Sequence, residues 1–157
     1  MCRVGRPYPG LMSRWDDGTD GVVELPDGRC VRGTGARRPR GDVPAPEHAV
    51  YLLGRDPQVT GWPNRWVRWP DFRLPSSTDD AVAALRDAHA RAGTERVELA
   101  CAGGRGRTGT ALSVLAVLSG VAPEDAVAWV REHYHPKAVE TRAQRRWVER
   151  VGDLLLD

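Results

Sequence analysis

The pattern of apolar positions changes along the chain, from short alternating runs to helical spacing. Short runs rich in β-branched and aromatic residues predict strands at Val22–Leu25, Cys30–Arg32, Ala49–Leu53 and Trp66–Trp69. From Thr78 to Ala92 the apolar residues instead recur at helical spacing, which predicts a helix that starts after Ser77 and ends at Gly93. Strands therefore dominate the first part of the chain, and helices follow.

A second set of elements surrounds the most glycine-rich turn of the later half. Arg96–Ala100 is a short apolar strand, and the turn after it leads into a buried helix over about residues 108–119. Pro123 opens a further helix that stops near His135, and a last helix covers about residues 142–155. We expect one α/β domain over residues 1–157, with about residues 1–20 irregular.

Composition narrows the class of partner. The 157 residues include 23 basic and 21 acidic side chains, and a formal net charge of +2 gives no strong reason to expect nucleic acid or an anionic membrane. The longest apolar stretch, residues 111–122, is too short to cross a bilayer, and no secretory signal is visible. Three scattered cysteines give neither a disulfide framework nor zinc-ligand spacing. We expect a cytoplasmic protein, and the near absence of lysine indicates a GC-rich, bacterial genome.

The segment from Cys101 to Gly109, CAGGRGRTG, carries the most specific chemistry. Its glycines let the backbone curl until several N–H groups point inward, and such a nest suits a tetrahedral oxyanion, above all phosphate. The helix that follows adds its positive N-terminal end, and the planar guanidinium of Arg107 can bind two phosphate oxygens. Because the same groups stabilise a thiolate, Cys101 is the predicted nucleophile, although an inert core thiol is the alternative.

This segment resembles the Cys-x5-Arg phosphate loop of the protein tyrosine phosphatase superfamily, in the form common in dual-specificity members. The resemblance implies a tyrosine-phosphatase-like fold, with a central mixed β-sheet flanked by helices and the phosphate loop between a central strand and a helix. It implies hydrolysis of phosphomonoesters through a phosphocysteine, without a metal or another cofactor. Phosphate would be bound by Ala102, Gly103, Gly104, Arg105, Gly106 and Arg107.

Three further residues match the same family. The Trp-Pro-Asp sequence at 69–71 resembles its acid loop, so Asp71 is the candidate acid that protonates the leaving oxygen, with a plain turn as the alternative. Gln144 is similar to the glutamine that orients water in the second step, but Thr141 and Gln144 also have the spacing of a capping box. The hydroxyl of Thr108 either stabilises the thiolate as the phosphoenzyme breaks down or caps the helix.

The substrate is less well defined than the mechanism. The family implies a phosphorylated protein or peptide, with phosphotyrosine favoured. Arg105 stands where phosphoinositide phosphatases often carry lysine, which favours a phosphorylated small molecule, yet Ala102 supplies no second basic group. Most members also have histidine where this chain has Ala100, which leaves the degree of thiol activation open. A non-catalytic phosphate-binding module is a further alternative, against which the retained nucleophile, arginine and acid argue.

Other interpretations fit the sequence less well. A nucleotide P-loop needs a Lys-Ser/Thr pair that is absent, the dinucleotide-binding fingerprint is missing, and a rhodanese-like sulfurtransferase would not need an acid loop. Tyr51, Trp62 and Trp66 could wall a deep aromatic pocket, but tryptophans more often serve the core. The basic run at residues 37–40 is interpreted as solvated surface, and the four histidines show no metal-ligand spacing.

Overall fold

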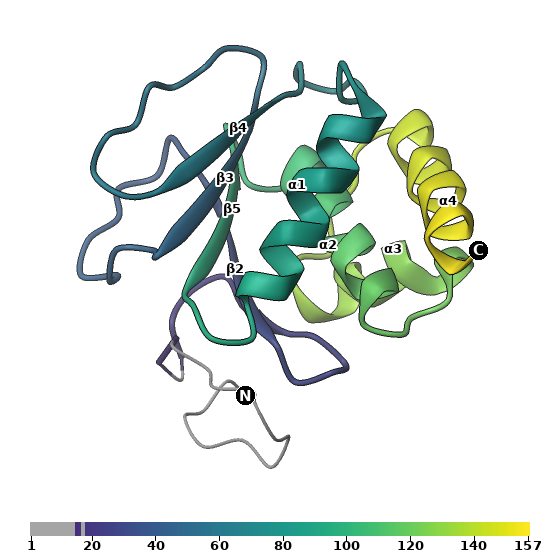
Figure 1. Ribbon diagram of the computed structural model, residues 1–157, viewed down its shortest axis with the longest axis horizontal. Helices are drawn as coiled ribbons and strands as arrows, with labels where there is room; N and C mark the ends of the chain where they lie inside the picture. The colour runs from purple at the N-terminus through teal and green to yellow at the C-terminus, as the bar shows by residue number, and fades with distance from the viewer. Residues whose placement is uncertain (1–14, 17) are drawn as a thin grey trace.

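The computed structural model describes residues 15, 16 and 18–157, and at its centre lies a five-stranded β-sheet (Figure 1). The order across the sheet is β1-β2-β5-β3-β4, where β1 pairs antiparallel with β2 and the other neighbours are parallel. The strands are β1 (Val22–Glu24), β2 (Cys30–Gly35), β3 (His48–Leu53), β4 (Asn64–Arg68) and β5 (Val97–Cys101). The sheet is mixed and its late strand β5 is central, so the predicted fold class is confirmed.

The helices lie together on one face of this sheet (Figure 1). They are α1 (Thr78–Arg91), α2 (Gly106–Leu118), a 3-10 turn η1 (Pro123–Asp125), α3 (Ala126–His133) and α4 (Arg142–Leu156). Ser77 caps α1 as predicted, because its hydroxyl accepts a hydrogen bond from the Asp80 amide at 3.1 Å. The predicted helices are therefore all present, with ends that differ by a few residues.

Side-chain alternation along β5 gives the sheet two different faces. Val97 and Leu99 belong to the main core between the sheet and the helices, whereas Ala100 belongs to a smaller cluster with Ala49 and Tyr51 on the opposite face. Helix α2 is buried over nearly its whole length because it contacts β5, α1, α3 and α4. Its position explains why its sequence is apolar on all sides.

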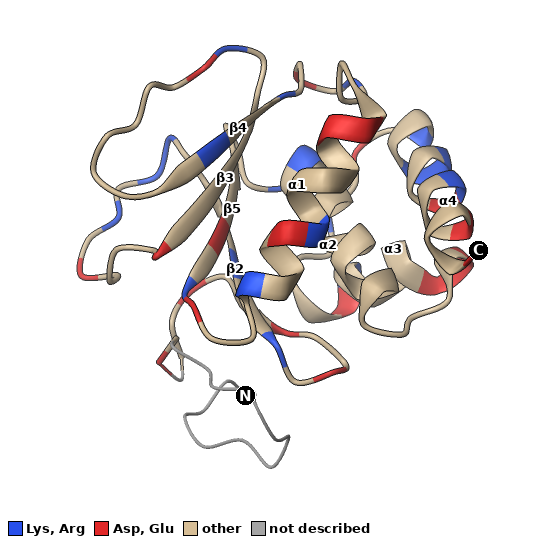
Figure 2. Ribbon diagram, viewed as in Figure 1, with Lys and Arg blue, Asp and Glu red and all other residues tan. Residues whose placement is uncertain are grey.

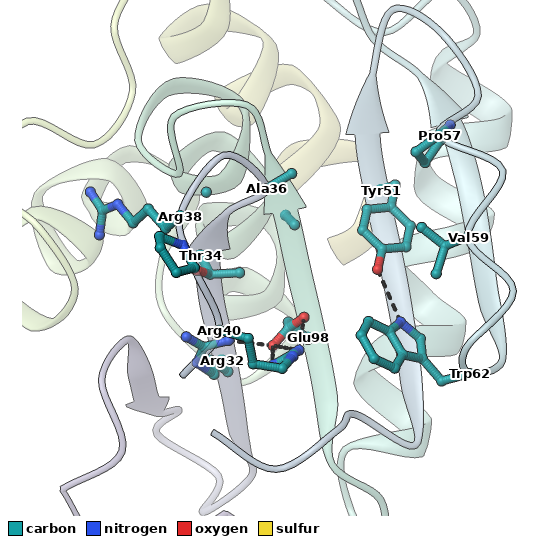
Figure 3. Close-up of a pocket in the computed structure, with 13 residues that line it drawn as sticks. Arg32, Thr34, Ala36, Arg38, Arg40, Tyr51, Pro57, Val59, Trp62 and Glu98 are labelled. Atoms are coloured by element: carbon teal, nitrogen blue, oxygen red, sulfur yellow. Dashed lines mark hydrogen bonds and ion pairs between the residues drawn. The ribbon is translucent and has the colours of Figure 1, made fainter. Parts of the chain in front are cut away.

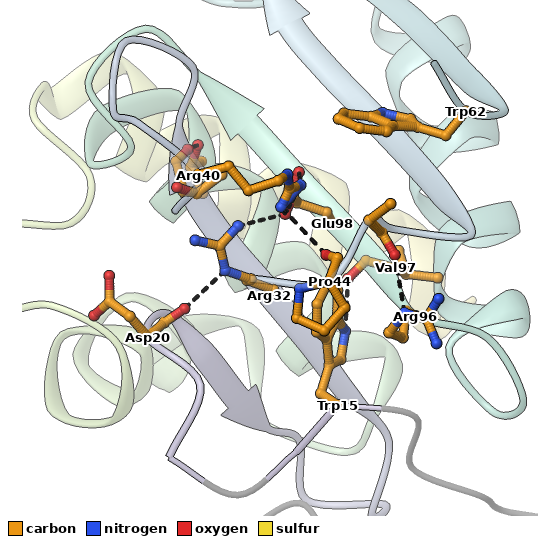
Figure 4. Close-up of polar contacts among 12 residues, drawn as sticks. Trp15, Asp20, Arg32, Arg40, Pro44, Trp62, Arg96, Val97 and Glu98 are labelled. Carbon is orange, nitrogen blue, oxygen red and sulfur yellow. Dashed lines mark hydrogen bonds and ion pairs between the residues drawn. The ribbon is translucent and has the colours of Figure 1, made fainter. Parts of the chain in front are cut away.

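Loops and charged side chains cover the opposite face of the sheet (Figure 4). The carboxylate of Glu98 binds the guanidinium groups of both Arg32 and Arg40, the latter at 2.6 Å. Arg40 also lies over the Trp62 ring, 4.9 Å from its centroid. The prediction that residues 37–40 form a solvated surface is therefore wrong for Arg40, which joins a buried ion network across β2 and β5.

The aromatic residues predicted as core or pocket walls lie on this same face. Trp62 Nε1 donates to the Tyr51 hydroxyl at 3.0 Å, and both side chains line a cavity of about 300 Å³ behind the sheet (Figure 3). Trp66 Nε1 donates to the Leu53 carbonyl at 2.8 Å. These three side chains therefore support the sheet and its loops.

Charges of both signs are interspersed along the helices and loops (Figure 2). None of the described helices is long and apolar enough to span a membrane. Most of the segment predicted to be irregular, residues 1–20, lies outside the described residues; its described part has a turn in which the Thr19 amide donates to the Asp16 carbonyl at 3.2 Å.

Candidate active site

The loop between β5 and α2 curls around the sulfur of Cys101, the last residue of β5. The Gly104 amide donates to Cys101 Sγ at 3.1 Å, and Gly104 has a φ of +81°, which favours glycine. A Cβ at Gly104 would lie 2.6 Å from the amide nitrogen of Gly35, so a side chain there would collide with β2. Backbone alone can occupy this position.

The sulfur lies where negative charge is stabilised. Cys101 is a buried free thiol, and α2 begins at Gly106 with its N-terminus directed toward the loop. The helix terminus and the amide of Gly104 both present partial positive charge to Sγ. This arrangement suits a bound oxyanion beside the sulfur.

A pocket of about 280 Å³ opens above this loop. It brings together most of the residues that the sequence singled out: Asp71, Cys101, Ala102, Gly103, Arg105, Gly106 and Arg107. Gly104 belongs to the same loop but does not line the pocket, so its predicted contact with phosphate stays a prediction. Four further residues line it that were not predicted as site residues: Arg37, Arg38, Phe72 and Glu140.

Arg107 connects the phosphate loop with the predicted acid loop. Its Nη1 donates to the Trp69 carbonyl at 2.9 Å, and its Nη2 lies 3.3 Å from Asp71 Oδ1. The Arg107 side chain is buried while that of Asp71 is 53% exposed. Within the described part of the chain, the buried Nε of Arg107 has no hydrogen-bond partner. An unpaired buried donor in this position suits an oxygen of a bound phosphate.

The acid loop is anchored by Trp69. This side chain is buried against Trp147, with ring centroids 5.3 Å apart, and its Nε1 donates to the Arg73 carbonyl at 2.8 Å. Phe72, next to Asp71, has a φ of +61° and is 57% exposed. A strained, exposed aromatic residue beside the pocket points to a role in function rather than in folding.

Gln144 forms the capping box that its spacing with Thr141 predicts. Its buried amide oxygen accepts from the amides of Glu140 at 3.0 Å and Thr141 at 3.3 Å, and the Thr141 hydroxyl accepts from the Gln144 amide at 3.1 Å. Its side-chain nitrogen donates to the Arg73 carbonyl at 3.2 Å. Gln144 thus ties α4 to the acid loop from outside the pocket, and its proposed action on water stays a prediction.

Thr108 does not cap α2, because the helix begins at Gly106 and its N-cap is Arg105. The Thr108 hydroxyl donates to the carbonyl of Thr34 at 3.4 Å and so links α2 with β2. A role in stabilising the thiolate stays a prediction.

The two unpredicted arginines reach the pocket through the extension of β2. The amide of Ala36 donates to the Cys101 carbonyl at 2.7 Å, and the Arg37 amide donates to the Ala102 carbonyl at 3.3 Å. These bonds hold the chain after β2 beside the phosphate loop. The arginines around the phosphate loop also affect His135: burial, followed by the charges of Arg105 and Arg38, lowers the pKa of this histidine.

A disulfide with a neighbouring cysteine could protect Cys101 from further oxidation, but Cys30 lies too far from Cys101 to form one. Gly35 pairs with Cys101, and Cys30 is five residues earlier on the same strand, roughly 16 Å away. Cys2 lies outside the described residues. Among the described residues there is also no group of three His, Cys, Asp or Glu side chains that could hold a metal ion.

Comparison with known proteins identifies the family. A family model described as protein-tyrosine phosphatase matches residues 53–149, which contain both the acid loop and the phosphate loop. The chain belongs to the protein-tyrosine phosphatase family. Two uncharacterized proteins of Methanocaldococcus jannaschii are similar to this phosphatase-family chain, at 39% and 37% identity over 87 residues, or 55% of the chain. Those residues cover 57% and 53% of the two proteins, so the chain spans about half the length of the curated relatives it matches.

Solved phosphatase structures share the fold. The active form of Tk-PTP has a TM-score of 0.66 at 24% identity, covering 88% of this chain and 99% of that one. Kinase associated phosphatase, with serine in place of its catalytic-site cysteine, has a TM-score of 0.61 at 12% identity and covers 90% and 98%. These similarities confirm the tyrosine-phosphatase-like fold predicted from the sequence.

Proposed function

We propose that this protein is a cysteine-dependent phosphatase that hydrolyses phosphomonoesters. The favoured substrate is phosphotyrosine in proteins or peptides, and the proposal includes dual specificity, in which phosphoserine or phosphothreonine is hydrolysed as well. The observation that carries the proposal is the position of Arg107. It contacts Trp69 and Asp71 on one side and lines the same pocket as Cys101 on the other. Cys101, Arg107 and Asp71 line one small pocket, which supports their assignment as nucleophile, phosphate clamp and acid.

The first step transfers the phosphoryl group to sulfur. The Cys101 thiolate attacks phosphorus, the bond to the ester oxygen breaks, and Asp71 gives its proton to the leaving oxygen. The loop amides and the Arg107 guanidinium bind the remaining phosphate oxygens, where charge develops. The leaving group departs as a neutral alcohol or phenol.

The second step releases phosphate. Water attacks the phosphocysteine, the Asp71 carboxylate accepts a proton from this water, and the S–P bond breaks to return the thiolate. The predicted roles of Thr108, in stabilising the departing thiolate, and of Gln144, in orienting the water, belong to this step. No part of this scheme requires a metal ion.

Phe72 favours an aryl phosphate as substrate. Phe72 is an exposed aromatic residue that lines the pocket, and it adjoins the acid that would protonate a phenolic oxygen. A phenyl ring entering the pocket would gain an aromatic contact there. Arg105, Arg37 and Arg38 line the same pocket and support the second candidate, a phosphorylated small molecule such as a phosphoinositide with further anionic groups.

The proposal is tested by hydrolysis of an aryl phosphate in EDTA and reductant. We expect Cys101→Ser to abolish turnover and Asp71→Asn to lower kcat by about 10²–10³-fold. Asp79→Asn is the matched control, because Asp79 is exposed in the first turn of α1 and does not line the pocket. Turnover that survives Cys101→Ser would refute the mechanism.

A comparison of substrates then ranks the alternatives. We expect a phosphotyrosine peptide to be hydrolysed faster than a phosphothreonine peptide or a phosphoinositide. A folded wild type that binds inorganic phosphate but hydrolyses none of them would instead support the non-catalytic binding module. A cytoplasmic location and a bacterial origin remain part of the proposal.

A further inference from the structure

Tyr134 supports the phosphate loop from below. It is the C-cap of α3, and its hydroxyl donates a short hydrogen bond to the Gly104 carbonyl. Tyr134 does not line the pocket, so it reaches the loop from the side away from the substrate. The site residues predicted from the sequence do not include it.

The Tyr134 ring is held against β2. A Cβ added to Gly33 would lie only 2.8 Å from two carbons of this ring, so the ring occupies the space that a side chain at position 33 would need. The ring is therefore fixed between β2 and the phosphate loop. Its hydroxyl has little freedom to leave Gly104.

The hydrogen bond controls the orientation of one peptide group. A trans peptide is planar, and its C=O and N–H point in opposite directions. Because Tyr134 binds the carbonyl of the Gly104–Arg105 peptide below the loop, the N–H of Arg105 points to the other side, where Arg105 lines the pocket. The Gly104 amide at the same time donates to Cys101 Sγ.

Gly104 is the weak point of this arrangement. Glycine lets the next peptide rotate at small cost, and a rotated peptide would turn a carbonyl oxygen toward the bound anion. We infer that Tyr134 is a positioning residue, whose hydroxyl holds the Gly104–Arg105 peptide in the orientation that binds phosphate and stabilises the thiolate. The inference rests on the proposed function of the same pocket.

The hydroxyl of Tyr134 stays protonated under the conditions of activity. Burial, followed by the nearby charge of Cys101, raises the pKa of Tyr134 to about 12. It therefore acts as a donor throughout the neutral range. A donor that stays protonated throughout the neutral range suits a permanent support rather than a proton-transfer group.

The test is Tyr134→Phe, which removes the hydroxyl and keeps the ring. We expect the inhibition constant for inorganic phosphate to rise by about five- to tenfold, because one buried hydrogen bond orders the anion site. The rate constant for alkylation of Cys101 by iodoacetamide should fall several-fold for the same reason. Tyr51→Phe is the matched control: its hydroxyl accepts a hydrogen bond on the far face of the sheet, so both quantities should keep their wild-type values.

A second variant covers the case in which Tyr134→Phe does not fold, as judged by its thermal transition. Gly33→Ala keeps the hydroxyl but displaces the ring, and we expect it to change each quantity in the direction given for Tyr134→Phe. Wild-type phosphate binding and wild-type alkylation of Cys101 in a folded Tyr134→Phe would overturn the inference. If the wild type itself bound no phosphate, the proposed function would fail, and the alkylation rate alone would still decide whether Tyr134 acts on the thiol.

Discussion

Arg107 is the side chain on which the geometry of the site depends most. One planar group contacts the Trp69 carbonyl and the Asp71 carboxylate and leaves a buried Nε–H free of any partner in the described chain. Lysine carries the same charge but cannot make these contacts together, because its ammonium lacks the fork of donors.

We therefore expect Arg107→Lys to lower kcat/KM for an aryl phosphate by roughly 100-fold or more, equivalent to about 3 kcal/mol of lost charged hydrogen bonds. Arg142→Lys, an exposed residue at the start of α4, is the control and should leave kcat/KM unchanged. A modest loss in Arg107→Lys, similar to the control, would show that charge alone suffices.

Single residues were predictable where the signal is local in the sequence. Cys101 and Arg107 belong to one short segment, and the structure places them with Asp71 in one pocket, while their catalytic roles stay predictions. Arg37 and Arg38 were missed as pocket residues because they reach it only through the pairing of β2 with β5, more than 60 residues later. No short-range pattern reports such a contact.

At the scale of elements, the start of α4 has two functions that one variant can separate. Gln144→Glu keeps an oxygen that accepts from the amides of Glu140 and Thr141, but it loses the donor to the Arg73 carbonyl. We expect a lower melting temperature, because the new carboxylate is buried and faces the Arg73 carbonyl, and also a lower kcat with little change in KM, because the acid loop loses its tether. A lower melting temperature with unchanged kcat would show that Gln144 serves the helix alone.

The start of α1 gives a test of stability apart from the site. Ser77→Ala removes the acceptor for the Asp80 amide and should lower the free energy of unfolding by about 1 kcal/mol in urea titration. The neighbouring Ser76→Ala is the control, since Ser76 lies outside the helix and is exposed. Equal stability of the two variants would contradict the assigned cap.

The helices were predicted more closely than the strands for a physical reason. Helical spacing and caps are encoded within one segment, as Ser77 illustrates. Strand β2 runs to Gly35, three residues beyond the predicted Arg32, because Gly33 and Gly35 suggest a turn when the chain is read alone. Their missing side chains instead make room for the Tyr134 ring and for the phosphate loop.

At the scale of the whole molecule, His48 makes folding sensitive to pH. It is buried at the start of β3, and burial, followed by the charge of Arg91, lowers the pKa of His48 below its usual 6.5. The unfolded chain then binds a proton more readily than the folded one. Stability is complete above pH 6.5 and falls as the pH drops below it.

Urea unfolding at pH 7.5 and 5.5 measures this effect. We expect wild type to lose up to about 1.4 kcal/mol of stability in total from this one residue over this interval, most of it below pH 6.5. His48→Gln should show a smaller dependence on pH, whereas His133→Gln, an exposed residue of α3, should keep the wild-type dependence. Equal slopes for all three proteins would rule out His48 as the cause.

The overall architecture followed from the sequence, but the order of strands did not. The change from strands to helices and the phosphate-loop segment predicted an α/β phosphatase fold, which the family match and the solved structures confirm. The placement of β5 between β2 and β3 depends on contacts between distant segments. That placement brings the chain after β2 to the edge of the pocket.

Gly104 in the phosphate loop and Gly35 in the strand beside it affect how sequence variation in this protein is interpreted. In a library with every substitution at every position, selected for activity, Gly35 and Gly104 will tolerate as few replacements as Cys101, because each sits against backbone atoms of the other's segment. A list of positions intolerant to substitution would therefore include glycines that take no part in catalysis. Measuring the soluble yield of each variant beside its activity would separate positions needed for folding from positions needed for catalysis.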